Sequence, residues 1–164
     1  MKKTDIHLHL TFEQHPKTEH MFVSSAEHML PHLRELSIEK GILMSSGEGN
    51  SAVPFGSNDE CRQIAEAFPG IYFWMCNLDD VPENIFERLE TYKNQGAVGI
   101  GELMINRSID DPMIQEIFAA AETLSLPVLF HMSPEVGYEY GIVDDAGLPL
   151  LEESLKKISK SEIH

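Results

Sequence analysis

Basic residues are scarce in this 164-residue sequence. The 12 lysines and arginines are outnumbered by 27 aspartates and glutamates, which gives a formal net charge of −15. Proteins that bind nucleic acids or anionic membranes gather lysine and arginine at the phosphate groups, so this balance argues against both classes of partner. A small-molecule substrate is compatible with it.

Long apolar runs are missing as well. No stretch approaches the roughly 20 apolar residues that a helix needs to cross a membrane. Lys2 and Lys3 are followed by His7, His9 and Glu13 rather than by an apolar segment, so we predict that there is no secretory signal peptide. The expected location is therefore the cytoplasm.

Cysteine is rare too. The two cysteines, Cys61 and Cys76, lack the paired spacing of a zinc site, and each lies in an apolar run. A disulfide between them is disfavoured in a chain without an export signal. We predict two small, buried thiols.

What the sequence does contain is a regular alternation of β-type runs and segments with helical periodicity. The predicted strands cover residues 4–10, 41–44, 71–76, 97–103 and 127–132. Apolar residues at helical spacing follow each strand, behind capping signals such as Ser24 with Glu27, Asp80 with Pro82, and Pro149. The strands begin about every 30 residues, which is the length of one β/α unit.

Strands that alternate with helices imply a parallel sheet in an α/β fold. Two architectures fit this pattern: an open, doubly wound sheet, or part of a (β/α)₈ barrel with about five β/α units. Periodicity alone does not choose between them. Residues 1–164 contain no linker or low-complexity tract, so we expect a single domain.

Residues that can bind a metal stand where three of the predicted strands end. His7 and His9 close the first strand, Glu102 the fourth and His131 the fifth. Side chains alternate along a strand, so the first two imidazoles share a face and can bind one divalent cation. Taken singly, each residue has a plainer explanation, as a strand-end histidine bonded to a loop or a glutamate in solvent. In a barrel the strand ends converge, so the set and the barrel interpretation support each other.

These residues and their surroundings resemble the amidohydrolase superfamily, most closely the branch called amidohydrolase family 2. The stretches that carry the resemblance are 5–9, 99–103, 127–134 and 147–153. The resemblance implies a (β/α)₈ barrel that holds one or two divalent ions, with zinc as the expected metal. It assigns His7 and His9 to the first ion and His131 to the second. Glu102 stands where the family carries a residue that bridges both ions, and Glu102 and His131 are the predicted catalytic residues.

The sequence departs from the family pattern after the fifth strand. The family takes a further histidine from strand six, and from strand eight an aspartate that serves as general base. Asp144 and Asp145 are predicted to lie in a loop, and His164 reads as the edge of a sixth strand. A complete barrel needs about 250 residues, so we expect a chain truncated after strand five. An open barrel would be covered by a second copy or by a complementing chain.

Four further residues are candidates for substrate contact. Glu13 and His15 follow the first strand, and Tyr138 and Tyr140 lie in the long loop after the fifth. In a barrel these loops surround the site, although each could equally be ordinary loop structure.

Three functional hypotheses follow. The first is a metal-dependent hydrolase, in which activated water attacks a C–N or C–O bond of a small-molecule amide, ester or lactone. The second is a metal-dependent decarboxylase of the same branch. The third is a catalytically silent metal-binding fragment or assembly partner. The fourth-strand Glu102 favours the hydrolase, because it allows a second metal ion.

Overall fold

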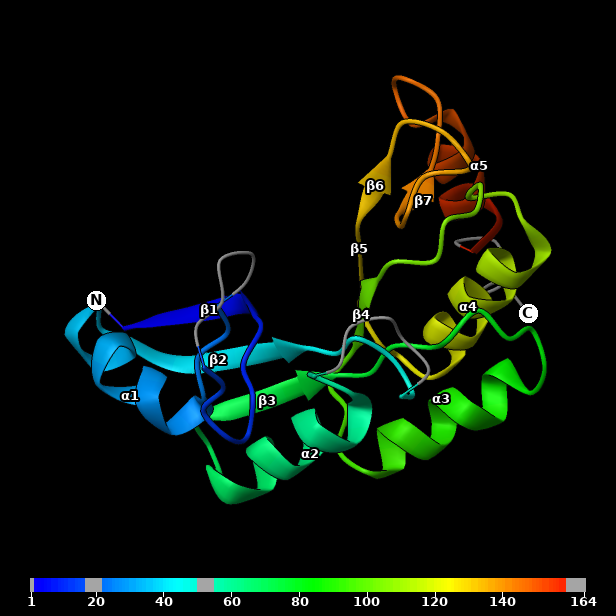
Figure 1. The fold of residues 1–164 in the computed structure, drawn as a ribbon. Coiled ribbons are helices and arrows are strands. Elements are labelled where there is room, and N and C mark those ends of the chain that lie inside the picture. Colours follow the sequence, from blue (N-terminus) through cyan, green and yellow to red (C-terminus); the bar gives the residue numbers. More distant parts are fainter. Residues whose placement is uncertain (1, 17–21, 50–54, 159–164) are drawn as a thin grey trace.

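The computed structural model describes residues 2–16, 22–49 and 55–158, and it follows the predicted alternation of strands and helices (Figure 1). The elements, in chain order, are β1 (Lys3–Leu8), α1 (Ala26–Glu35), β2 (Ile38–Met44), α2 (Asn58–Ala67), β3 (Tyr72–Met75), α3 (Ile85–Asn94), β4 (Ile100–Leu103), α4 (Pro112–Thr123), β5 (Val128–Phe130), β6 (Met132–Ser133), β7 (Ile142–Val143) and α5 (Pro149–Ile158).

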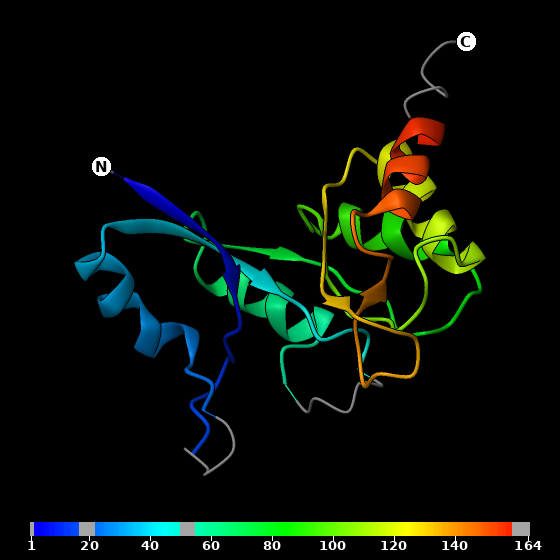
Figure 2. The same ribbon diagram turned by 90° about the horizontal axis from the view of Figure 1, so that it is seen from above.

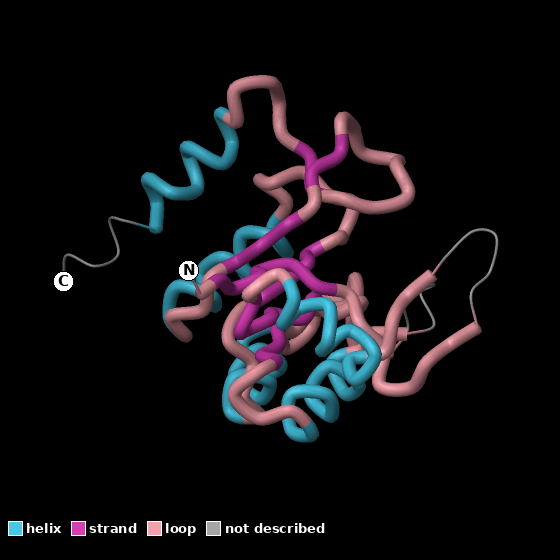
Figure 3. Tube along the Cα trace, turned by 90° about the vertical axis from the view of Figure 1, so that its left-hand side faces the viewer, coloured by secondary structure: helices cyan, strands magenta, loops and turns pink. Residues whose placement is uncertain are grey.

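The first five strands are parallel and follow one another in chain order. β1 pairs with β2, β2 with β3, and β4 with β5, all in parallel register. A bridge between Cys76 and Ile100 joins β3 to β4. Most of the helices lie on one side of the strands (Figure 3), which is the arrangement of part of a (β/α)₈ barrel. The prediction of an α/β fold with about five parallel β/α units is confirmed.

The core forms where the helices meet the strands. α4 shows the helical period well, because its apolar residues at helical spacing are buried throughout: Met113, Ile114, Ile117, Phe118, Ala121 and the following Leu124. Each of the larger of these side chains contributes about 1.5–3 kcal/mol by leaving water. α5 lies beside α4 (Figure 1 and Figure 2), and Gln115 Nε2 donates to Ser154 Oγ at 2.8 Å between them. Among the described residues, no helix has the length and hydropathy that crossing a membrane requires.

Three predictions of local structure are wrong. The N-cap of α1 is Ser25, whose side chain accepts from the amide of His28, rather than the predicted Ser24 with Glu27. α3 begins at Ile85 rather than behind Asp80, with Asn84 as its N-cap residue. Asp80 is engaged elsewhere, because its carboxylate accepts a hydrogen bond from Arg107 Nε at 2.9 Å. On α5, the helical spacing of the apolar residues predicts that Leu155 is buried, and it is 56% exposed. The apolar face of α5 is therefore only partly covered by neighbouring elements.

The edge of the sheet at β1 is open among the described residues. β1 pairs with β2 alone, and the side chain of Ile6 is 61% exposed. An unpaired strand edge with an apolar side chain favours association with another chain or strand. The predicted cover by a second copy or a complementing chain stays a prediction.

The two cysteines give a test of the packing. Burial raises the pKa of Cys61 and of Cys76 to about 12, and both thiols are free and buried. Since the thiolate is the reactive form, the folded chain is expected to react very slowly with a thiol-specific reagent at mildly alkaline pH. In denaturant both thiols should react at once. Fast modification of the folded chain would contradict the packing around α2 and β3.

Candidate metal centre

The two histidines at the end of β1 face each other. The Nε2 atoms of His7 and His9 are 3.1 Å apart, and their rings meet edge to face with centroids 5.0 Å apart. The backbone amide of His7 donates to Asp5 Oδ1 at 3.1 Å, which holds the strand end. The prediction that the two imidazoles share one face agrees with this geometry.

Glu102 reaches the two histidines from the end of β4. The glycines that precede it let β4 lie close to β5. A Cβ atom on Gly99 would lie 2.9 Å from the carbonyl oxygen of Pro127, and one on Gly101 would lie 2.9 Å from that of Leu129. Any larger residue would push β4 away from β5 at these points. The glycines therefore let the two strands approach closely and set the position of Glu102 at the strand end.

The two carboxylate oxygens of Glu102 face different histidines. Oε2 lies 3.2 Å from His7 Nε2 and 3.6 Å from His9 Nε2. Oε1 lies 3.0 Å from Nδ1 of His131, which directly follows β5. The side chain of Glu102 is only 11% exposed, whereas those of the histidines are 40–48% exposed. A nearly buried carboxylate thus stands between two imidazoles on one side and a third on the other.

This donor set fits a divalent metal. His7, His9 and Glu102 each offer one ligand atom, and these three atoms lie within 4.8 Å of one another. Two nitrogens bound at about 2.0–2.1 Å to one tetrahedral zinc ion lie roughly 3.3 Å apart, close to the separation of the two Nε2 atoms. Glu102 Oε1 and His131 Nδ1 offer donors for a second ion. The bridging role predicted for Glu102 is compatible with this geometry.

The electrostatics of the pair favour the metal-binding form of His9. Its pKa lies below the ordinary value of 6.5, first because burial disfavours the charged ring and then because His7 repels it; Glu102 acts in the opposite direction. The neutral imidazole is the form that binds a metal.

Of the four predicted substrate contacts, Tyr140 reaches the centre. Its ring lies 4.7 Å from that of His131, edge to face, although Tyr140 is 45% exposed. Tyr138 is also exposed. His15 lies near Phe55, with ring centroids 6.5 Å apart. For Glu13, the contact found is a hydrogen bond from the hydroxyl of Thr11 to its backbone carbonyl, which does not involve the carboxylate. The substrate-contact predictions stay untested.

A small cavity of about 100 Å³ adjoins the centre. Its lining comes from four loops and strand ends: His9, Leu10, Met44, Ser46, Phe55, Gly56 and Met104. A larger cavity of about 570 Å³ lies elsewhere, near Lys2, Arg34 and Glu39, and none of the predicted site residues lines it. The smaller cavity is the one that belongs to the candidate centre, because His9, a predicted metal ligand, lines it. His164, interpreted as the edge of a sixth strand, lies outside the described residues.

Sequence reasoning missed the polar residues that surround the centre without belonging to it. Asn77 follows β3 just as the candidate ligands stand at the ends of their strands, and its side chain contacts the backbone of Glu102. Glu48 and Arg88 form an ion pair between the loop after β2 and α3. The position of Asn77 at a strand end was the available signal; the Glu48–Arg88 pair had none, because the partners are 40 residues apart.

Comparison with known proteins shows a fold likeness at low sequence identity. No protein-family model matches the sequence, and no curated protein matches it. Among solved structures, a probable 2-pyrone-4,6-dicarboxylic acid hydrolase from Acinetobacter baumannii matches with a TM-score of 0.56 at 17% identity, over 95% of this chain and 66% of the other. The 2,6-dihydroxybenzoate decarboxylase from Rhizobium matches with 0.60 at 17%, over 84% and 52%.

A third match is the 5-carboxyvanillate decarboxylase from Novosphingobium aromaticivorans, solved with bound manganese, with a TM-score of 0.61 at 14% identity over 94% of this chain and 55% of the other. The present chain thus spans about half to two thirds of the length of these proteins. At such identity the likeness establishes the shared barrel fold.

The signs of the His9 shift can be measured by NMR titration of the metal-free chain. We expect a midpoint below 6.5. His7→Ala should raise it, because a repelling ring is removed, and Glu102→Gln should lower it further, because an attracting charge is removed. Shifts of the opposite sign would contradict the geometry of the cluster.

The same shift has a consequence for stability. Between the lowered pKa and about 6.5, the unfolded chain binds a proton at His9 that the folded chain does not bind. The metal-free fold should therefore lose stability as the pH falls through this window, and His9→Gln should weaken that dependence in urea titrations.

Proposed function

We propose that this chain belongs to the amidohydrolase superfamily and carries the metal-binding part of a metal-dependent hydrolase that acts on a small molecule. The observation that carries the proposal is the carboxylate of Glu102, which faces His7 and His9 with one oxygen and His131 with the other. The likeness of the fold to a probable 2-pyrone-4,6-dicarboxylic acid hydrolase supports it.

In this proposal, His7, His9 and Glu102 hold one divalent ion, and Glu102 and His131 hold a second. Imidazole and carboxylate donors suit zinc, and they suit manganese as well. Zinc is the ion that we propose first. The bound manganese of the Novosphingobium decarboxylase makes manganese the alternative to test beside it.

In this proposal, the chain's own residues bind the metal ions and orient the groups around them. Bound ions of this kind polarise a carbonyl group and lower the pKa of a water molecule to about 7. Glu102 holds the two ligand groups at a fixed separation, and Tyr140 covers one side of His131. Among the described residues, Glu102 is the carboxylate that contacts these imidazoles, and it serves as a ligand. The general base of the hydrolytic step is therefore not assigned to any described residue.

A decarboxylase of the same branch is the second candidate. Two of the matching structures are decarboxylases of aromatic acids, with TM-scores of 0.60 and 0.61. Such an enzyme would use the same histidines to hold a carboxylated substrate while carbon dioxide leaves. The third candidate is a silent metal-binding fragment or assembly partner. The observation that supports it is the open edge of β1, where another chain could pair.

Metal content is the first test. Purified chain dialysed against zinc or manganese is expected to retain about one to two ions, counted by mass spectrometry across a gel-filtration peak. The double variant His7→Ala/His9→Ala should lose at least one ion per chain, and His131→Ala should lose one at most. The matched control is His28→Ala/His32→Ala, which removes two exposed histidines of α1 and should keep the full content. A well-folded wild-type chain without metal would refute the proposed site.

The reaction class is tested separately on the metal-loaded chain. Small lactones, esters and amides are expected to be hydrolysed, and a chelator or Glu102→Gln should reduce the rate by at least about 100-fold, since both remove the metal bridge. Release of carbon dioxide from aromatic carboxylates without hydrolysis would favour the decarboxylase. Folded, metal-loaded chain that turns over neither class would favour the silent fragment.

A further inference from the structure

Three consecutive carbonyl groups at the end of β4 are held by three different segments. The carbonyl oxygen of Gly101 accepts from the amide of Ser45 at 3.1 Å, and that of Leu103 accepts from the amide of His131 at 3.1 Å. Between them, the carbonyl oxygen of Glu102 accepts from Nδ2 of Asn77 at 2.8 Å. The middle contact is the only one of the three that a side chain makes.

We propose that Asn77 is a positioning residue of the metal centre, and that it fixes the backbone of Glu102 so that the carboxylate reaches both groups of histidines. This inference rests on the proposed function, since it concerns the same centre. Asn77 touches neither the three ligand imidazoles nor the Glu102 carboxylate in any contact found among the described residues; it acts through the main chain of Glu102.

The carboxamide of Asn77 has one orientation that satisfies its neighbours. Oδ1 accepts from the amide of Leu78 at 2.9 Å, and Nδ2 donates to the carbonyl oxygens of Ser45 at 3.3 Å and Glu102 at 2.8 Å. The reversed amide would place an oxygen against two carbonyl oxygens. Asn77 is buried, with 3% of its surface exposed, so water cannot replace these bonds readily.

Asn58 holds the backbone of Asn77 in turn. Its Oδ1 accepts from the amide of Asn77 at 2.9 Å, and its Nδ2 donates to the carbonyl oxygen of Asn77 at 2.8 Å. Asn58 is the first residue of α2 and is equally buried. This pair of hydrogen bonds mimics strand pairing and fixes where the chain leaves β3.

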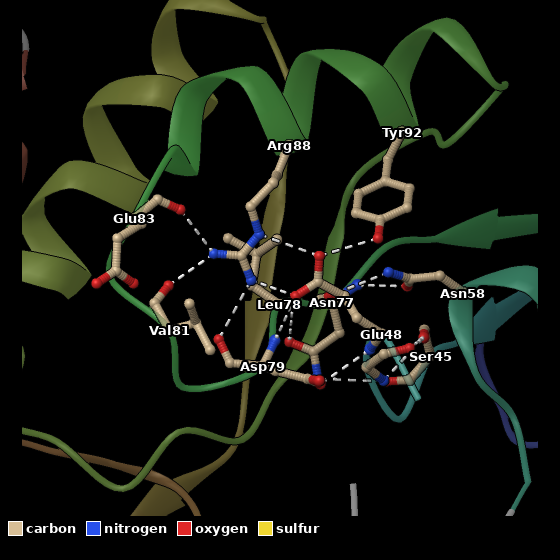
Figure 4. A network of polar contacts seen from close by, with 11 residues as sticks. Ser45, Glu48, Asn58, Asn77, Leu78, Asp79, Val81, Glu83, Arg88 and Tyr92 are labelled. Atoms are coloured by element: carbon tan, nitrogen blue, oxygen red, sulfur yellow. Dashed lines mark hydrogen bonds and ion pairs between the residues drawn. The ribbon is translucent and has the colours of Figure 1, made fainter. Parts of the chain in front are cut away.

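A half-buried ionic cluster joins the neighbouring loops, as Figure 4 shows. The Glu48 carboxylate forms an ion pair with Arg88 and accepts from the hydroxyl of Tyr92 at 2.9 Å. Each of the two carboxylates also accepts from the other residue's backbone: the Glu48 amide donates to Asp79 Oδ1 at 2.9 Å, and the Asp79 amide donates to Glu48 Oε2 at 3.1 Å.

Asn58 also ties α2 to the loop that carries Glu48, because its backbone amide donates to the carbonyl oxygen of Gly47 at 2.8 Å. Burial raises the pKa of Tyr92 to about 12, so its hydroxyl stays protonated and keeps its bond to Glu48. A series of contacts therefore runs from Arg88 on α3, through Glu48 and its loop, to Asn58, Asn77 and the backbone of Glu102. Residues that orient a ligand in this way commonly change metal affinity by roughly 10- to 100-fold when they are removed.

The test is metal affinity measured by titration of the metal-free chain with Co²⁺, read from its visible absorption, with zinc competition. Asn77→Ala is expected to weaken binding by roughly 10- to 100-fold and to change the absorption spectrum at saturation. The matched control is Ser154→Ala, which removes another buried side chain bonded to a backbone carbonyl, outside the centre. It should leave affinity and spectrum unchanged.

A double-mutant cycle separates positioning from general loss of stability. If Asn77 acts through Glu102, then Asn77→Ala should cost little further affinity in a Glu102→Gln background. Equal losses in both backgrounds would overturn the proposal. Asn77→Asp serves as the second variant if Asn77→Ala does not fold, because it keeps the size and the acceptor for Leu78 but lacks the donor to Glu102. The same loss and the same cycle are expected from it.

The outcomes distinguish this inference from the proposed function. Wild-type affinity that His7→Ala/His9→Ala abolishes but that Asn77→Ala and Asn77→Asp leave intact would overturn the role of Asn77 and keep the metal centre. A folded wild-type chain that binds neither Co²⁺ nor zinc would overturn both.

Discussion

Burying a carboxylate costs several kcal/mol unless charged partners, hydrogen bonds or a metal ion compensate for it. The side chain of Glu102 is only 11% exposed, and the compensation comes from three imidazoles brought by the ends of β1 and β5. Those imidazoles can meet it only if the strands between them run parallel and stay in order. The polar end of the sheet is therefore tied to the parallel topology of the whole molecule.

Further contacts around the Glu102 carboxylate hold the strand ends together. Close approach at Gly99 and Gly101 brings β4 against β5, and Asn77 links the end of β3 to the backbone of Glu102. Farther out, the Glu48–Arg88 pair joins the loop after β2 to α3. The exposed histidines thus stand on a less exposed, hydrogen-bonded base, an arrangement that would keep the geometry of the proposed metal centre.

The fold alone does not identify the reaction. The matching structures include a probable hydrolase and two decarboxylases, all at 14–17% identity. One barrel can serve either chemistry, because the residues of the site decide the reaction. In this chain the described site offers three histidines and one carboxylate, so the proposed reaction rests on those four side chains.

The sequence by itself determined the alternation of strands and helices and singled out the four residues that we propose as metal ligands. Both follow from local patterns: a period of two in strands, 3.6 in helices, and polar residues where strands end. Only the tertiary structure decided that Glu102 divides its oxygens between two groups of histidines, that Tyr140 lies against His131, and that Asn77 holds Glu102. It also decided where α3 begins, since Asp80 bonds to Arg107 instead of capping the helix. Such contacts join residues 9 to 95 positions apart, and local periodicity carries no information about which distant partners will meet.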